Sequence, residues 1–75
     1  MNLTYDIEID VSGKEHRGKT TLIAYLSKIL DSSGAELIVQ HADPQIDDKL
    51  HMTMDQLREK LAGKRIFLRE IHDQI

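Results

Sequence analysis

The chain has 75 residues, no cysteine and a formal net charge of −3. This length allows a single domain, residues 1–75, with a small core, because a chain of about 60 residues buries only roughly 60% of the surface that it exposes when unfolded. The missing cysteines exclude a disulfide framework and thiolate metal sites, and the acidic balance argues against direct binding of nucleic acid.

The N-terminal segment alternates strictly between apolar and polar residues from Leu3 to Val11. Its polar positions include the acids Asp6, Glu8 and Asp10. A period of two predicts a strand with one face in water. A strand covered by helices on both faces would be apolar throughout, so we expect helices on only one face of the sheet.

The stretch from Gly13 to Thr21 matches G-x-x-x-x-G-K-[ST], the Walker A pattern of a phosphate-binding loop (P-loop). Gly13 and Gly18 allow the backbone to turn so that successive N–H groups face an anion. Lys19 would reach the β- and γ-phosphates of ATP or GTP, and the Thr20 hydroxyl would bind the bridging Mg²⁺. The alternative is that Gly13 forms a turn after the strand and Gly18 begins a helix, with no ligand.

Apolar residues recur at helical spacing after the loop, which predicts a helix from Thr20 to Asp31 with Gly34 as a left-handed cap. Residues 35–41 are rich in β-branched side chains and predict a second strand. A helix between two strands normally joins parallel neighbours in one sheet.

Residues 42–49 contain the only proline and three acids, and are expected to form a loop. Thr53 and Gln56 have the spacing of a capping box and predict a second helix, which Gly63 ends. Residues 65–71 are expected to form a third strand. The predicted fold class is therefore α/β, a small two-layer β-α-β-α-β domain with a three-stranded, mainly parallel sheet and helices on one face.

Two motifs together resemble the deviant Walker A ATPases of the partitioning and septum-positioning class. The first runs from Lys14 to Thr21, and the second is Ala42-Asp43-Pro44-Gln45. The resemblance covers residues 7–45, and implies ATP and Mg²⁺ binding by Lys19 and Thr20, a contact from Lys14 across a dimer, and support of the metal or the attacking water by Asp43. The chain departs from the family pattern at Glu15, His16 and His41. A looser resemblance is to P-loop proteins in general, including very short ones of the kind that phages encode.

Hydrolysis would require a second acid near the metal-bound water. Glu70, at the end of the third predicted strand, is the weak candidate, and an ion pair with Arg65 or Arg69 is the alternative for it. The four histidines have no compact metal-ligand spacing. We therefore expect binding of a nucleoside triphosphate or phosphate with weak or partner-dependent hydrolysis.

The alternative function is a small, non-enzymatic interaction or inhibitor module of phage type that keeps a P-loop-like turn. Its acidic row at Asp6, Glu8 and Asp10 would suit a basic partner or solvent. A homodimer and a larger protein partner are compatible with both hypotheses. No apolar run has the length of a membrane span and the first residues lack a basic leader, so we expect a cytoplasmic protein.

Overall fold

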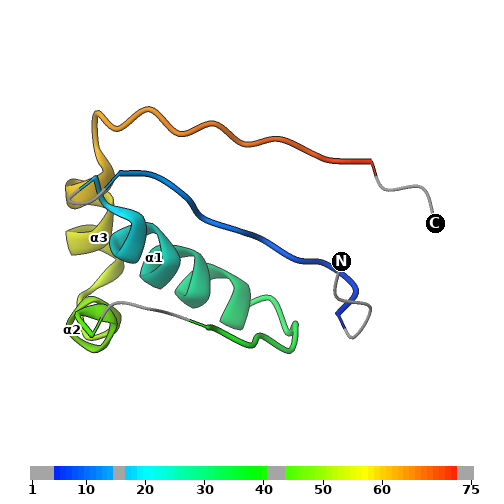
Figure 1. The fold of residues 1–75 in the computed structure, drawn as a ribbon. Coiled ribbons are helices and arrows are strands. Elements are labelled where there is room, and N and C mark those ends of the chain that lie inside the picture. The colour runs from blue at the N-terminus through cyan, green and yellow to red at the C-terminus, as the bar shows by residue number, and fades with distance from the viewer. Residues whose placement is uncertain (1–4, 15–16, 41–43, 73–75) are drawn as a thin grey trace.

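The computed structural model describes residues 5–14, 17–40 and 44–72. In these ranges it has three helices: α1 (Lys19–Asp31), α2 (Ile46–Leu50) and α3 (Met54–Leu61). Three extended segments, residues 5–14, 35–40 and 64–72, lead into and out of them (Figure 1). No helix in the described ranges has the length and apolar character needed to cross a bilayer.

Helix α1 confirms the helix predicted after the loop. It begins directly after Gly18, which adopts a left-handed conformation (φ 99°, ψ 18°). The first hydrogen bond of the helix runs from the Leu22 N–H to the Gly18 carbonyl, at 2.9 Å. Gly34 also has a positive φ of 88°, as predicted for the residue that turns the chain after the helix. A glycine therefore stands directly before α1 and another lies in the turn that follows its C-cap, Ser32, and at both positions the left-handed backbone costs little.

Helix α2 lies where the sequence predicted a loop, and that prediction was wrong for residues 46–49. Pro44 stands just before the helix, and Asp47 and Asp48 occupy its first turn. The two carboxylates favour the start of a helix because they complement the positive end of the helix dipole, and Pro44 lies just outside the helix, where it removes no helical hydrogen bond. The proline and the acids were thus interpreted as signs of a loop, whereas they stand at the start of a short helix.

Helix α3 begins with the predicted capping box. The Thr53 N–H donates to Gln56 Oε1 at 2.9 Å, and the Gln56 N–H donates to Thr53 Oγ1 at 3.1 Å. Both bonds are local, so the sequence alone was sufficient to predict them. Gly63, with φ 81°, follows the helix and turns the chain into the C-terminal segment.

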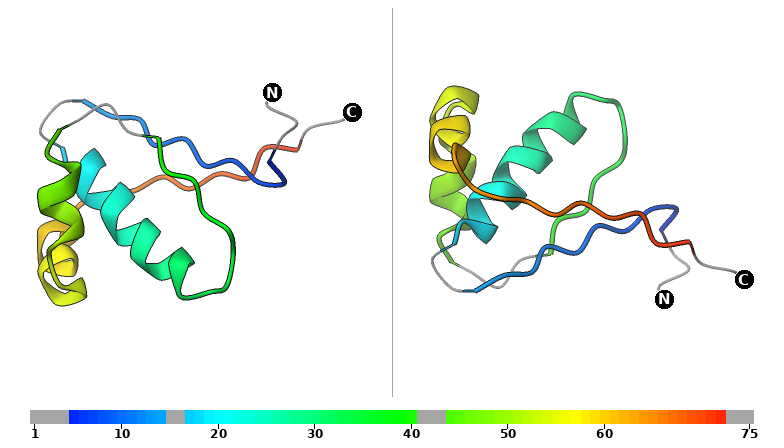
Figure 2. Two further views of the ribbon diagram at one scale, coloured as in Figure 1. Left: turned by 90° about the horizontal axis from the view of Figure 1, so that it is seen from below. Right: turned by 90° about the horizontal axis from the view of Figure 1, so that it is seen from above.

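The core lies where α2 and α3 pack against α1. Ala24 of α1 and Leu57 of α3 are fully buried, and Ile46 of α2 is 1% exposed. Figure 2 shows α2 and α3 lying together across the N-terminal end of α1. The core therefore holds the beginning of α1, where the glycine loop ends.

The predicted three-stranded sheet is not formed, and the α/β fold class was wrong. In the described ranges no strand is present, and no backbone hydrogen bond joins one extended segment to another. Alternation places side chains on two faces of an extended chain, but it does not specify a pairing partner, which depends on contacts distant in sequence. The described structure is mainly helical, with three extended segments running past α1 instead of a two-layer sheet (Figure 1).

The apolar residues that would have lined the sheet remain largely in water. Ile7 and Phe67 are each 82% exposed and Leu68 is 89% exposed. The start of the C-terminal segment is held more closely, because Ile66 lines a shallow hollow with Leu22 and Leu61. Burial in this chain is therefore concentrated in the helices.

We expect Leu57→Ala to lower the free energy of unfolding by about 2–5 kcal/mol, because it empties a fully buried site. Ile38→Ala is the matched control, since Ile38 is 64% exposed and should change stability by only about 0.5 kcal/mol or less. Chemical denaturation followed by circular dichroism measures both. An equal loss from the two variants would contradict the helical core.

Candidate functional site

The candidate site is the turn that connects the N-terminal segment to α1. Gly18 caps α1 through its backbone alone, without a side-chain hydrogen bond, and the first turn of the helix contains no acid. The amides of Lys19 and Thr21 precede the Leu22 N–H, the first donor of the α1 hydrogen bonds. This end of α1 thus combines the positive end of the helix dipole with backbone donors, which favours an anion.

Lys19 folds back over the first glycine of the motif. A Cβ built on Gly13 would lie 3.5 Å from Cγ of Lys19 and 3.7 Å from its Cδ. The aliphatic part of Lys19 therefore lies close to Gly13, at a distance that would just accommodate a methyl group there. A P-loop requires its lysine to turn back along the loop in this way, so that the ammonium meets phosphate held by the backbone.

Lys64 approaches the same turn from the other end of the chain. A Cβ built on Gly18 would lie 3.8 Å from Cε of Lys64. Sequence reasoning missed this residue, because only the packing of α3 against α1 returns the chain to the loop. Its only sequence signal was its position directly after Gly63, the glycine that reverses the chain after α3.

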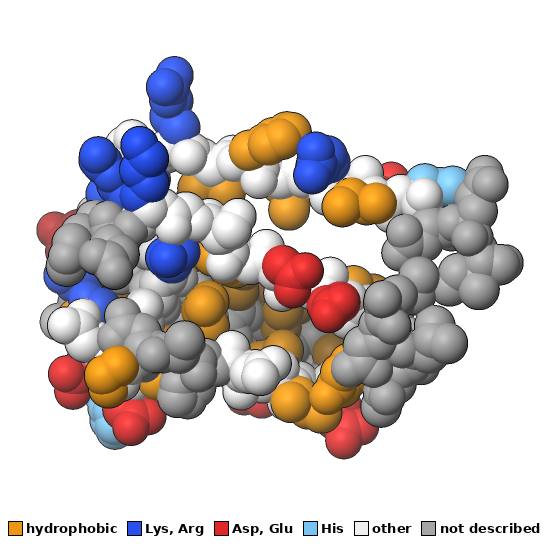
Figure 3. All heavy atoms as spheres, viewed as in Figure 1, with side chains coloured by type: hydrophobic (Ala, Val, Ile, Leu, Met, Phe, Trp, Pro, Cys, Tyr) orange, Lys and Arg blue, Asp and Glu red, His pale blue; other side chains and the backbone are white. Residues whose placement is uncertain are grey.

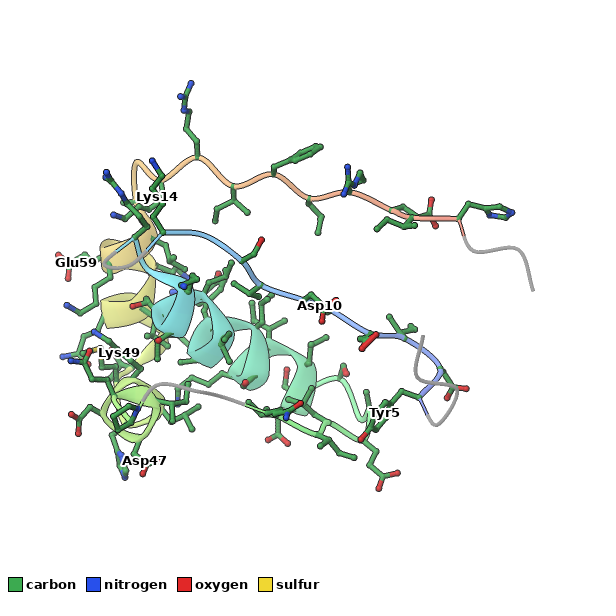
Figure 4. All side chains as sticks on the ribbon, in the orientation of Figure 1. Tyr5, Asp10, Lys14, Asp47, Lys49 and Glu59 are labelled. Atoms are coloured by element: carbon green, nitrogen blue, oxygen red, sulfur yellow. The ribbon has the colours of Figure 1, made fainter. Side chains whose placement is uncertain are left out.

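Basic side chains gather around the turn. Lys14 is next to Gly13, Arg17 is next to Gly18, and Arg65 is next to Lys64. Figure 3 shows Lys and Arg side chains grouped at this end of the molecule, and Figure 4 places Lys14 where the N-terminal segment reaches α3. The ion pair that the described residues form is elsewhere, between Arg58 and Asp55 at 2.5 Å. This end therefore carries positive charge although the whole chain is acidic.

The two threonines of the motif have different surroundings. Thr20 is half-buried in the first turn of α1, and Thr21 is buried at 5% exposure beside the core. In this position Thr21 can contribute its backbone amide to the loop more readily than its hydroxyl. Thr20 keeps the position that a magnesium-binding hydroxyl needs, directly after the lysine.

The predicted acids are not brought together with the loop in the described structure. Asp43 lies outside the described residues, as do Glu15, His16 and His41. Glu70 belongs to the C-terminal segment, which starts beside the loop and leads away from it past the length of α1 (Figure 1). Among the described residues, no three His, Asp or Glu side chains form a group that could hold a metal ion.

The chain matches no protein-family model, no curated protein and no solved structure. The resemblance to the partitioning ATPases therefore rests on the motif residues alone.

Gly18→Ala is expected to lower the free energy of unfolding by about 1–2 kcal/mol, because an L-residue is strained at its left-handed backbone. Gly18→Asn should cost less, since asparagine tolerates this conformation better. Gly13→Ala is the matched comparison: its φ is not positive and its added methyl would meet Lys19 at an ordinary distance. Thermal melts without ligand compare the three, and a Gly13→Ala loss as large as that of Gly18→Ala would contradict this geometry.

Proposed function

We propose that this chain binds the phosphate groups of a nucleoside triphosphate, ATP or GTP, through the turn from Gly13 to Thr21. The observation that carries the proposal is the position of Lys19, whose stem lies over Gly13 while its backbone opens α1. The side chain of Lys19 thus lies beside the first glycine of the motif, while its backbone begins the helix. That arrangement supports the proposal, because an ammonium and helix N-terminal amides are the groups that hold a phosphate anion.

In this proposal each side chain has a distinct task. The amides of the first turn hold the phosphate oxygens, and Lys19 neutralises the charge of the terminal phosphates. The Thr20 hydroxyl binds Mg²⁺, with Asp43 as the second metal contact. Lys64, close to Gly18, adds a cation from the C-terminal segment.

Hydrolysis in this proposal is weak or depends on a partner. Phosphoryl transfer to water needs a residue that positions the attacking water. Glu70 lies on a segment that leads away from the loop. A partner that supplies this residue, or that brings Glu70 back to the loop, would then be required for turnover. Lys14, exposed at the edge of the turn, is the residue that would contact nucleotide across a dimer.

Mg-ATP or Mg-GTP should stabilise the chain, and Lys19→Ala should abolish that effect. A ligand at about 100 times its Kd adds about 2.7 kcal/mol to the free energy of unfolding, which is readily seen in a thermal melt. Lys28→Ala is the matched control, because Lys28 lies in the last turn of the same helix. Unchanged melting of the natural chain at millimolar nucleotide would refute the proposal.

The same melts test Lys64. Lys64→Ala should weaken binding about fivefold, corresponding to about 1 kcal/mol for an exposed charge contact. Lys60→Ala, on the exposed surface of α3, should leave the affinity unchanged. Equal affinities for Lys64→Ala and Lys60→Ala would show that Lys64 does not contribute to the site.

A further inference from the structure

The extended segments at the two ends of the described chain are exposed and are not paired with another strand. Residues 5–10 and 65–72 are all exposed, and within the described ranges they form no backbone–backbone hydrogen bond. In Figure 3 an open gap separates part of the C-terminal segment from the rest of the molecule. Unpaired extended segments with alternating apolar residues are the surfaces to which another strand adds.

The two segments carry complementary rows of charge. Asp6 and Asp10 lie four residues apart on the polar side of the N-terminal segment, with Glu8 between them. Arg65 and Arg69 have the same spacing on the C-terminal segment, with Phe67 between them. Because successive side chains of an extended chain alternate, each set occupies one face. The Arg69 guanidinium lies 5.7 Å from the centre of the Phe67 ring, as expected for residues on the same face.

Pairing the two segments would bring opposite charges together on one face and apolar side chains together on the other. With Glu8 opposite Phe67, each aspartate faces an arginine in either strand direction, because the two rows share one spacing. On the other face Ile7 and Ile9 then meet Ile66 and Leu68, four apolar residues that are now at least half exposed. Opposite charges and apolar pairs both stabilise neighbouring strands.

We propose that residues 5–11 of one copy pair with residues 64–71 of a second copy, and the reverse, in a two-fold dimer. In the described structure the two segments of one chain form no backbone hydrogen bond with each other, so a second copy can supply each missing partner, and two equivalent pairings close the assembly. The dimer also covers apolar surface that stays in water because, among the described residues, only three apolar side chains are fully buried. This inference is independent of the nucleotide proposal.

Analytical ultracentrifugation of the full chain and of charge-swapped variants tests the dimer. The natural chain should show twice the monomer mass at high micromolar concentration. Asp6→Arg with Asp10→Arg should be monomeric, as should Arg65→Asp with Arg69→Asp. An equimolar mixture of the two variants should recover the dimer, because their charges are again complementary.

The matched control for the aspartate variant is Asp31→Arg with Glu59→Arg, which makes the same change in net charge outside the two segments. Asp31 ends α1 and Glu59 lies in the second half of α3, where positive charge is compatible with the helix dipole. This control should remain dimeric, and circular dichroism should show unchanged helix in every variant. A monomeric natural chain would overturn the proposal, as would a mixture of swapped variants that stays monomeric.

Discussion

The packing of Ile46 and Leu57 against Ala24 is the interaction on which the rest of the described structure depends. These residues come from α2, α3 and α1, and they are the apolar side chains that the described chain buries fully. A small residue at position 24 lets α2 and α3 approach α1 closely. Because this contact fixes the N-terminal half of α1, it also fixes the direction of the amides after Gly18. The packing of α3 on α1 brings Lys64, which follows α3, close to Gly18.

The candidate site and the unpaired extended segments at the two ends of the described chain both follow from this arrangement. The helical core organises one end of the molecule, where Lys19 lies over Gly13 and basic side chains surround the turn. It does not reach along residues 5–10 and 66–72, whose apolar residues stay exposed. A candidate anion-binding turn next to unpaired extended segments is consistent with the two proposals, that the chain binds an anion by itself and that a second copy covers its exposed segments.

The features that the sequence predicted correctly are local ones. The capping box of Thr53 and Gln56 and the left-handed Gly34 are fixed by residues within a few positions of each other. The predicted sheet was wrong because the alternation at residues 3–11 and 65–71 indicates which side chains share a face, but not which segment each strand would pair with. Lys64 could not be predicted as part of the site because its distance to Gly18 depends on how α3 packs on α1. The Walker A motif predicted the position of the turn and helix, while its ligand is still a proposal.

The most direct test of the central claim, that the turn before α1 is an anion site, is a titration of the ¹⁵N-labelled chain with Mg-ATP followed by amide NMR. If the turn binds the nucleotide, the largest shifts will fall on the amides of Gly18, Lys19, Thr20 and Thr21, with a smaller response at Lys64 and none in the middle of α3. Titration with inorganic phosphate should affect the same amides. Shifts confined to other parts of the chain, or no shifts at millimolar nucleotide, would contradict it.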